Sequence, residues 1–480
     1  MRRLLPMFCL VALLFLLSSL VTAQQKLTYI VQYSSEHSGR IHVQIAPASP
    51  INSPVTLVMP RAIPSGYAQQ FYDRYVDQVK ATTSSETPPK KQDGPRWRVE
   101  QPGLTKIEYE VDVARLEQEI FDASAASKVR PEYVGLLGYS VLGYLEGFEN
   151  LPVHLEVDAP QGWPVFTTLT PKVPCDTTKT LTEARNFYEL ADSQIAMGPK
   201  LELRRLPTPV PLFLAIYSEV PTDIKKHGEI FADAFMKVLA YFSIGPFDHY
   251  TAYIEILKPL SERHDYGFSM EHLTSSTYFL GVTRAIDANT SPQQLELERF
   301  NFAHHVTHSW IPKHVYGTGY MPFLWELAPQ IDTIWFNEGF ARYVAIEALA
   351  DALPVAEAKK FRQQRLDSYR KLIDSMPGFI RSMSLVELSR VGSSMYSEDF
   401  RIGQTLFCKG ALMAAAMDDS IRKQTQGRNR LRDSLRALVS WSEHSGRAFR
   451  IAELPGLIAR PVGVNEQSIR TIMNEWLKGS

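Results

Sequence analysis

The sequence predicts an α+β protein of several domains, because of its length and a change of pattern part-way along the chain. At 480 residues, it exceeds the size at which a single hydrophobic core is normally sufficient. Short runs that alternate apolar and polar residues fill positions 26–205 and are typical of strands. After a proline-rich stretch at 206–211, the apolar spacing becomes helical. We therefore expect an N-terminal β domain, then an α/β domain, then a helical domain.

The N-terminal domain, residues 24–206, is expected to be β-sandwich-like. The segment 82–95 is polar and rich in proline, serine and lysine, which predicts an exposed loop. Three prolines within 206–211 resist both helix and central strand, so the domain boundary is placed there. The predicted strands are 27–33, 41–45, 55–59, 106–111, 153–157 and 165–169.

The second domain, residues 207–350, begins with a predicted helix at 224–242 and a strand at 250–257. Ser291 and Pro292 then have the residue types of an N-cap and a first helical position. That helix is expected to continue until Pro312 prevents it. Residues 351–480 are expected to form a helical domain. The remaining predicted helices are 333–350, 354–375, 409–423, 429–444 and 466–478.

The first 23 residues have the three parts of a secretory signal peptide. Arg2 and Arg3 precede a short apolar run at 10–20, and a small-x-small ending predicts cleavage after Ala23. An uncleaved membrane anchor is the alternative, but the run is short for a full span. The sequence therefore predicts an exported protein, periplasmic or secreted, with no membrane association after cleavage.

Composition excludes some classes of partner and leaves the cysteine chemistry open. Lys+Arg of 51 against Asp+Glu of 52 gives a net charge of −1, which offers no support for nucleic-acid binding. Only Cys175 and Cys408 would remain after signal cleavage. One disulfide is possible in an exported protein, but two cysteines do not make a disulfide scaffold.

The strongest chemical signal is a pair of histidines in the helix that begins at Ser291. His304 and His308 stand at i and i+4, so both imidazoles leave the same helix face and can bind one metal ion. A catalytic zinc site needs three protein ligands and an open fourth position. Glu338, on the next predicted helix, is the candidate third ligand. Two such histidines alone are more often surface or packing residues, so the metal interpretation depends on this glutamate.

Several motifs together resemble the glycyl aminopeptidase family of zinc metallopeptidases. Residues 304–310 match the pattern HExxHxW except at the glutamate, and residues 335–343 match W-F-x-E-G-x-x-x-Y throughout. The gap of 29 residues between His308 and Glu338 is similar to that of the family. Residues 266–272 resemble its Y-G-G-x-E-H strand, and residues 59–67 resemble, less closely, its M-P-x-W-T-P-G-S-Y segment.

This resemblance covers residues 26–480 and implies a thermolysin-like α/β metallopeptidase domain at 207–350. It implies zinc bound by His304, His308 and Glu338. It also implies that Glu271 faces the free amino group of a peptide, a carboxylate holding an ammonium. The partner would therefore be a peptide or protein with a free N-terminus. The sequence leaves no segment for the PDZ domain that the family usually carries.

Two positions depart from the family pattern, and both concern groups that act on the reacting atoms. His305 stands in place of the glutamate that serves as general base. An imidazole can act as a base, but it lacks a negative charge, and it could instead become a fourth metal ligand. Phe407 stands in place of a tyrosine whose hydroxyl would bind the oxyanion. The loss of one oxyanion donor typically lowers the rate by about 10²–10³.

These departures favour a zinc-binding protein of peptidase fold with weak or absent peptidase activity, a pseudoenzyme that retains binding of peptide N-termini. One alternative is an active zinc aminopeptidase that uses His305 as its catalytic base. A second alternative treats the histidines as ordinary polar residues of a metal-free interface protein.

Overall fold

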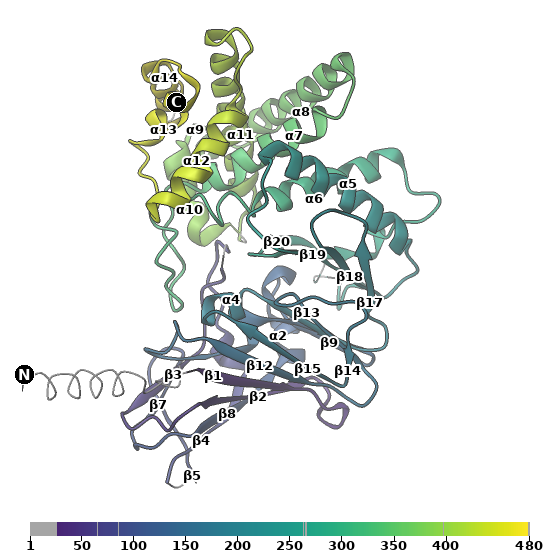
Figure 1. Cartoon of the computed structure of the whole chain (residues 1–480), viewed down its shortest axis with the longest axis vertical. Helices are drawn as coiled ribbons and strands as arrows, with labels where there is room; N and C mark the ends of the chain where they lie inside the picture. The colour runs from purple at the N-terminus through teal and green to yellow at the C-terminus, as the bar shows by residue number, and fades with distance from the viewer. Residues whose placement is uncertain are drawn as a thin grey trace, which may run out of the picture.

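The computed structural model describes residues 26–478, except positions 65, 85, 263, 265 and 397. β-rich layers form the N-terminal end, a further sheet with helices packed on it lies in the middle, and helices form the opposite end (Figure 1). This arrangement confirms the predicted α+β, multidomain class. The predicted signal peptide, residues 1–23, lies outside the described residues.

A seven-stranded sheet carries most of the strands predicted in the N-terminal domain. β1 (Leu27–Gln32) pairs in parallel with β12 (Val153–Asp158) and antiparallel with β2 (Arg40–Pro47). Buried and partly exposed side chains alternate along these strands, because one face of the sheet covers the core. The sheet order is β15-β12-β1-β2-β8-β4-β5, with β4 at Val76–Thr82, β5 at Glu86–Thr87, β8 at Lys106–Asp112 and β15 at Lys179–Ala184.

Two smaller sheets complete the N-terminal domain. One has the order β14-β13-β16-β10-β9 and the other the order β11-β3-β7-β6. The predicted loop at 82–95 contains the short strands β5 and β6, which are too short to produce a period in the sequence. The new strands are β3 (Val55–Val58), β6 (Lys90–Lys91), β7 (Arg96–Val99), β9 (Lys128–Arg130), β10 (Tyr133–Leu137), β11 (Tyr144–Leu145), β13 (Pro164–Thr167), β14 (Asp176–Thr177) and β16 (Gln194–Met197).

The middle of the molecule is a five-stranded sheet of order β17-β18-β19-β21-β20. α5 (Ile224–Phe242) matches its predicted bounds and connects the parallel strands β18 and β19. The predicted division at 206/207 falls between β17 and β18, which pair with each other. The strands are β17 (Glu202–Leu206), β18 (Leu212–Ser218), β19 (Tyr250–Leu257), β20 (Gly267–Glu271) and β21 (Ser275–Gly281).

The helix that carries the histidine pair is α6 (Pro292–Thr307). The Ser291 side chain accepts a hydrogen bond from the backbone N–H of Gln294, and Pro292 is the first helical residue, as predicted. The helix ends earlier than Pro312, and His308 is its C-cap. The His308 N–H bonds to the carbonyl of His305, an i→i−3 bond that tightens the last turn.

The C-terminal half is helical, and its apolar faces share a single core with α5 and α6. The predicted helix at 333–350 is a π-helical turn, η5 (Trp335–Phe340), followed by α7 (Ala341–Ala350). Sequence patterns missed α10 (Leu385–Met395), although Ser384 and Glu387 form a capping box there. The other long helices are α8 (Val355–Ser375), α11 (Phe400–Gln424), α12 (Leu431–Ser445) and α14 (Glu466–Leu477).

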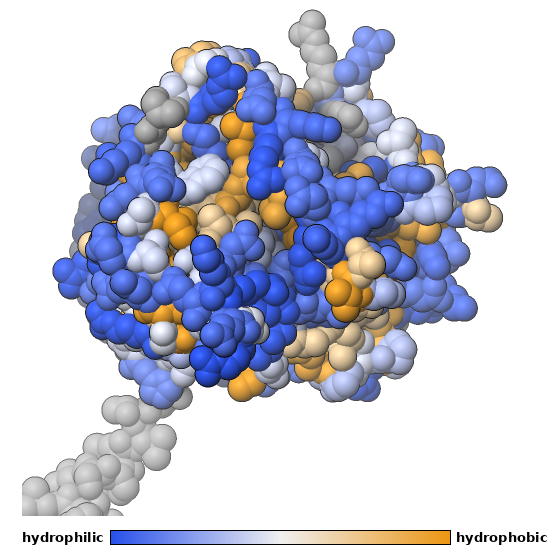
Figure 2. Space-filling view, turned by 90° about the horizontal axis from the view of Figure 1, so that it is seen from above, coloured by the Kyte–Doolittle hydropathy of each residue, from blue (hydrophilic) through white to orange (hydrophobic). Residues whose placement is uncertain are grey.

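Short helices fill the connections: α2 (Val113–Glu119), α3 (Gly138–Val141), α4 (Phe187–Ala191), α9 (Gly378–Ser382), α13 (Leu454–Ala459), and the 3₁₀ turns η1 (Ser35–His37), η2 (Tyr72–Tyr75), η3 (Ala123–Ala125), η4 (Val282–Arg284) and η6 (Arg460–Val462). Seen from the helical end, the surface is mostly hydrophilic, with apolar side chains in separate patches (Figure 2).

In the described part of the chain, no helix is long and apolar enough to cross a membrane. Cys175 is partly exposed and Cys408 is buried, and both are free thiols.

Candidate metal centre

The structure brings His304, His308 and Glu338 into one buried cluster. The two histidine Nε2 atoms lie 3.2 Å apart. The Glu338 Oε2 atom lies 3.3 Å from Nε2 of His304 and 3.5 Å from Nε2 of His308. Ligand atoms about 2.1 Å from a tetrahedral zinc lie about 3.4 Å from one another. The three atoms therefore have the spacing of three ligands around one zinc ion.

Local structure aims the His308 ring at this cluster. Its Nδ1 donates a hydrogen bond to the carbonyl of Ile311 at 2.8 Å. A proton held on Nδ1 leaves the Nε2 lone pair for a metal, and such a carbonyl partner is typical around histidine ligands. His304 is also buried, and its Nδ1 has no hydrogen-bond partner.

A tyrosine from the N-terminal domain orients the Glu338 carboxylate. The Tyr67 hydroxyl donates to Oε1 of Glu338 at 2.9 Å, and the Asn337 side-chain amide donates to the Tyr67 oxygen at 3.3 Å. Oε1 is thus held by a hydroxyl, while Oε2 faces the histidines. Partners of this kind fix a metal ligand's orientation.

Burial and close packing set the protonation of the cluster. Burial, aided by the charge of His308, lowers the pKa of His304 to about 4. Burial also lowers the pKa of His308, but Glu271 and Glu338 outweigh it and raise that pKa to about 9. Burial raises the pKa of Glu338, yet the two histidines outweigh it and hold that pKa well below its usual range. The cluster is therefore arranged around negative carboxylate charge that attracts a cation.

Glu271 and His305 lie beside the three ligand candidates. Glu271 ends β20, and its Oε2 lies 3.9 Å from His305 Nδ1 and 4.0 Å from His308 Nε2. Its Oε1 is buried without a partner, and burial raises its pKa. The His305 ring packs edge-on against Tyr278 at 5.5 Å. Burial and the two neighbouring histidines hold the pKa of His305 well below its usual range, so this imidazole is neutral.

His305 is close enough to the metal cluster to take part in it. One nitrogen from each of His304, His305 and His308 lies within 4.8 Å of the others. The Nδ1 atom of His305 is buried and has no hydrogen-bond partner. The structure thus places His305 next to the ligand candidates, within reach of a role as base or as further ligand.

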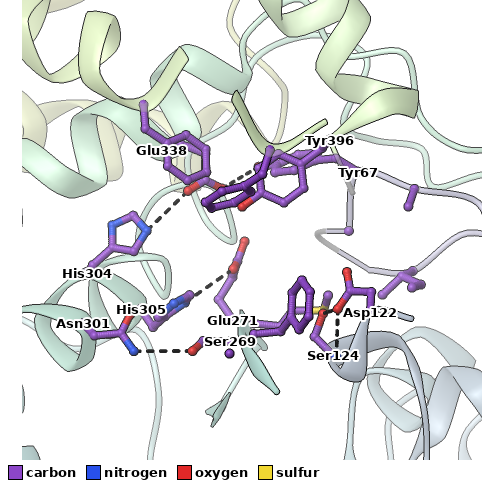
Figure 3. A pocket seen from close by; sticks show the side chains of 18 of the residues that line it. Tyr67, Asp122, Ser124, Ser269, Glu271, Asn301, His304, His305, Glu338 and Tyr396 are labelled. Atoms are coloured by element: carbon purple, nitrogen blue, oxygen red, sulfur yellow. Dashed lines mark hydrogen bonds and ion pairs between the residues drawn. The ribbon is translucent and has the colours of Figure 1, made fainter. Parts of the chain in front are cut away.

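Glu271, His304, His305 and Glu338 line a cavity of about 470 Å³ between the N-terminal domain, β20 and the helices. In Figure 3, Tyr67, Tyr396 and Glu338 occupy one side of it, and Asn301 and Ser269 the other. Phe407 also lines the cavity, with its ring centre 6.2 Å from that of His304. The volume falls within the range of about 300–1,000 Å³ typical of small-molecule sites.

Tyr67, Arg342 and Tyr396 are among the residues of this cavity to which sequence reasoning gave no role. Tyr67 ends the segment that resembles a family motif, which was a signal for its proximity. Arg342 follows Glu338 by four positions, a spacing that places two residues on one helix face. Tyr396 lies just beyond α10, which was itself missed, and no pattern in the sequence pointed to it.

Comparison with known proteins agrees with this fold. Residues 28–199 match the family described as the peptidase M61 N-terminal domain. No curated protein sequence matches the chain. An aminopeptidase N family protein from Idiomarina loihiensis superposes with a TM-score of 0.81 at 18% identity, over 93% of this chain and 75% of that one.

Two other solved structures are more distantly similar. Yeast LTA4 hydrolase gives a TM-score of 0.56 at 13% identity, over 95% of this chain and 68% of that one. A variant of the M1 zinc metallopeptidase from Deinococcus radiodurans gives 0.51 at 16% identity, over 94% of each chain. At these identities the comparisons establish the fold alone. The chain has an aminopeptidase-like metallopeptidase fold with a possible His/Glu metal site.

Proposed function

We propose that this is an exported zinc-binding protein that captures the N-termini of peptides or proteins and hydrolyses them weakly or not at all. The observation that carries the proposal is the mutual spacing of 3.2–3.5 Å among His304 Nε2, His308 Nε2 and Glu338 Oε2. That spacing suits a tetrahedral zinc ion. Zinc is thus the metal that the donor set favours.

The residues around the metal site support binding more than catalysis. Zinc, when bound, supplies a Lewis acid that polarises a carbonyl oxygen. We expect the Glu271 carboxylate, whose Oε1 is buried without a partner, to hold a peptide ammonium. His305 is a weak substitute for a carboxylate base, because burial and neighbouring histidines disfavour its protonated form. Phe407 has no hydroxyl with which to stabilise an oxyanion.

One observation favours the alternative of an active aminopeptidase with His305 as the base. The Tyr396 ring lies 5.7 Å from the Phe407 ring, and both line the cavity. A hydroxyl beside Phe407 offers a substitute oxyanion donor. In that case Tyr396→Phe would lower the hydrolysis rate by about 10²-fold or more, with zinc content unchanged.

The decisive experiment combines zinc content with hydrolysis of amino-acid anilides and short peptides. We expect one zinc per chain and turnover close to buffer for the wild type. The double substitution His305→Glu with Phe407→Tyr should raise turnover, and a chelator should abolish the gain. The same pair in a His304→Ala background is the control and should stay inactive.

Other outcomes separate the competing functions. Chelator-sensitive turnover by the wild type would establish the active aminopeptidase and contradict impaired catalysis. A zinc content near zero would favour the metal-free interface protein. Mass spectrometry of the mature N-terminus tests export, because signal cleavage after Ala23 leaves Gln24 as the first residue.

A further inference from the structure

Arg342 is a cationic side chain of the cavity that has no anionic partner. It lies in the first turn of α7, four residues after Glu338, and lines the same cavity. Within the described residues, no carboxylate lies within ion-pair distance of its guanidinium, and its Nε atom is buried without an acceptor. The residue as a whole is partly exposed, but a charged group with a buried polar atom is normally paired. Arg342 therefore has unused capacity to bind an anion.

Two aromatic rings lie beside the guanidinium, and the hydroxyl of one of them, Tyr369, also approaches it. Its Cζ atom lies 4.7 Å from the centre of the Phe407 ring and 5.9 Å from that of Tyr369. Ring contacts of this kind use the face of the guanidinium or its charge. The N–H groups point outward in its plane and form a fork that matches a carboxylate.

The charge of Arg342 persists in this setting. Burial lowers its pKa, but Tyr369, Cys408, Tyr396 and Glu338 outweigh burial and raise it. Glu338 lies against His304 and His308, so its charge is already compensated, whereas Oε1 of Glu271 is buried without a partner and stays available to an ammonium group. Arg342 is consequently the group in the cavity wall to which a negatively charged part of a ligand would bind.

We propose that Arg342 binds the C-terminal carboxylate of a short peptide whose amino group is held by Glu271. The inference rests on the proposed function and names its ligand class: dipeptides or tripeptides with both termini free. An extended peptide spans about 3.5 Å per residue, so two or three residues cover about 7–11 Å. A cavity of about 470 Å³ suits such a ligand, whereas a longer peptide would extend out of the cavity.

Titration calorimetry with trialanine and its C-terminal amide tests the proposal on the zinc-loaded protein. The two peptides differ only in the terminal charge. We expect the acid to bind about tenfold more tightly than the amide, a typical effect of a hydrogen bond to a charged group. Mass spectrometry after each titration verifies that the peptides are intact.

Variants locate the effect. Arg342→Met keeps an apolar stem against Phe407 and should bind both peptides equally, with zinc content unchanged. Arg342→Lys keeps the charge but not the fork and should retain part of the preference. Arg447, which lies over Trp441 and pairs with Glu453 away from the cavity, supplies the control Arg447→Met, and this variant should behave as the wild type.

The outcomes also separate this proposal from peptide capture. If the wild type binds the acid and the amide equally, Arg342 does not have the proposed role. Capture of the peptide amino group would still stand in that case, provided that N-acetyl-trialanine amide fails to bind. A preference for the acid that survives in Arg342→Met would overturn the role of Arg342 as well. Binding of neither peptide would overturn both ideas, and the zinc content would still report on the metal site.

Discussion

At the scale of single residues, the protonation of His308 couples the nearby carboxylates to the proposed zinc site. Glu271 and Glu338 outweigh the effect of burial and raise its pKa to about 9. A histidine must be deprotonated to bind zinc. At pH values between the ordinary pKa of histidine and about 9, a zinc ion must therefore displace the proton that the neighbouring carboxylates stabilise on His308.

Zinc binding should accordingly release about one proton per chain near pH 7.5. The release should fall toward zero as pH rises above about 9, because His308 is then already neutral. The number of protons released is measured by calorimetric titration of the chelator-treated protein with zinc. The titration is repeated in buffers of different ionisation enthalpy. Zinc binding without proton release at pH 7.5 would contradict this account of the cluster.

The hydrogen bond from Tyr67 to Glu338 gives a second prediction at this scale. Tyr67→Phe removes the donor on Oε1 and should weaken zinc affinity about 10–100-fold, the usual effect of losing an outer partner of a ligand. Competition with a chromogenic chelator measures the affinity. Tyr33→Phe is the matched control in the same domain, because Tyr33 does not line the cavity. Equal affinity in the two variants would show that Glu338 needs no such support.

At the scale of elements, the packing of α11 against η5 positions Glu338. Gly339 and Gly410 face each other across this contact, and a Cβ atom on Gly339 would clash with the Gly410 backbone. A Cβ on Gly410 would clash with the Trp335 carbonyl. Both glycines therefore permit a close approach that brings the π-helical turn, and with it the carboxylate, to the histidines.

Gly339→Ala or Gly410→Ala should lower the free energy of unfolding by about 1–3 kcal/mol, as overpacking typically does, and should reduce zinc content. Chemical denaturation and metal analysis measure the two effects. Gly378→Ala is the control, since a Cβ there meets no atom within 4 Å. If the Gly339 variant kept wild-type stability and zinc, the close approach would not be what positions Glu338.

At the scale of the whole molecule, one buried carboxylate connects the N-terminal domain to the middle sheet. Asp192 caps α4 and lies 3.1 Å from His272 Nδ1 and 3.2 Å from Lys313 Nζ. It also accepts the backbone N–H of Leu273 at 2.6 Å. These contacts fix β20, and therefore Glu271, relative to the N-terminal domain.

Asp192→Ala should destabilise the protein by about 3–5 kcal/mol, because Lys313 is left buried and unpaired. Burial raises the pKa of Asp192, but Lys313 and His272 outweigh it and lower that pKa. The contribution is therefore complete above the ordinary carboxyl pKa of about 3.9 and lost as pH falls below it. Thermal unfolding at neutral pH, against the exposed control Asp176→Ala, checks the loss. A shift no larger than that of the control would exclude this interface as a major source of stability.

The sequence by itself determined much of the local structure around the site. The i and i+4 spacing of His304 and His308, with the N-cap at Ser291, specified a helix with both rings on one face. Motif resemblance brought Glu338 and Glu271 to the same site. Helical and strand periods likewise specified α5 and most strands of the N-terminal sheet, because each repeats over enough residues to be recognised.

Only the tertiary structure decided what surrounds those residues. Tyr67 reaches Glu338 across 271 positions of sequence, and among the described residues the buried Nε atom of Arg342 has no acceptor. Local periodicity carries no information about such contacts, since they depend on how whole elements meet. The proximity of His304, His308 and Glu338 could thus be anticipated from sequence, whereas the hydroxyl beside Glu338 and the arginine of the same cavity followed only from the packing of domains.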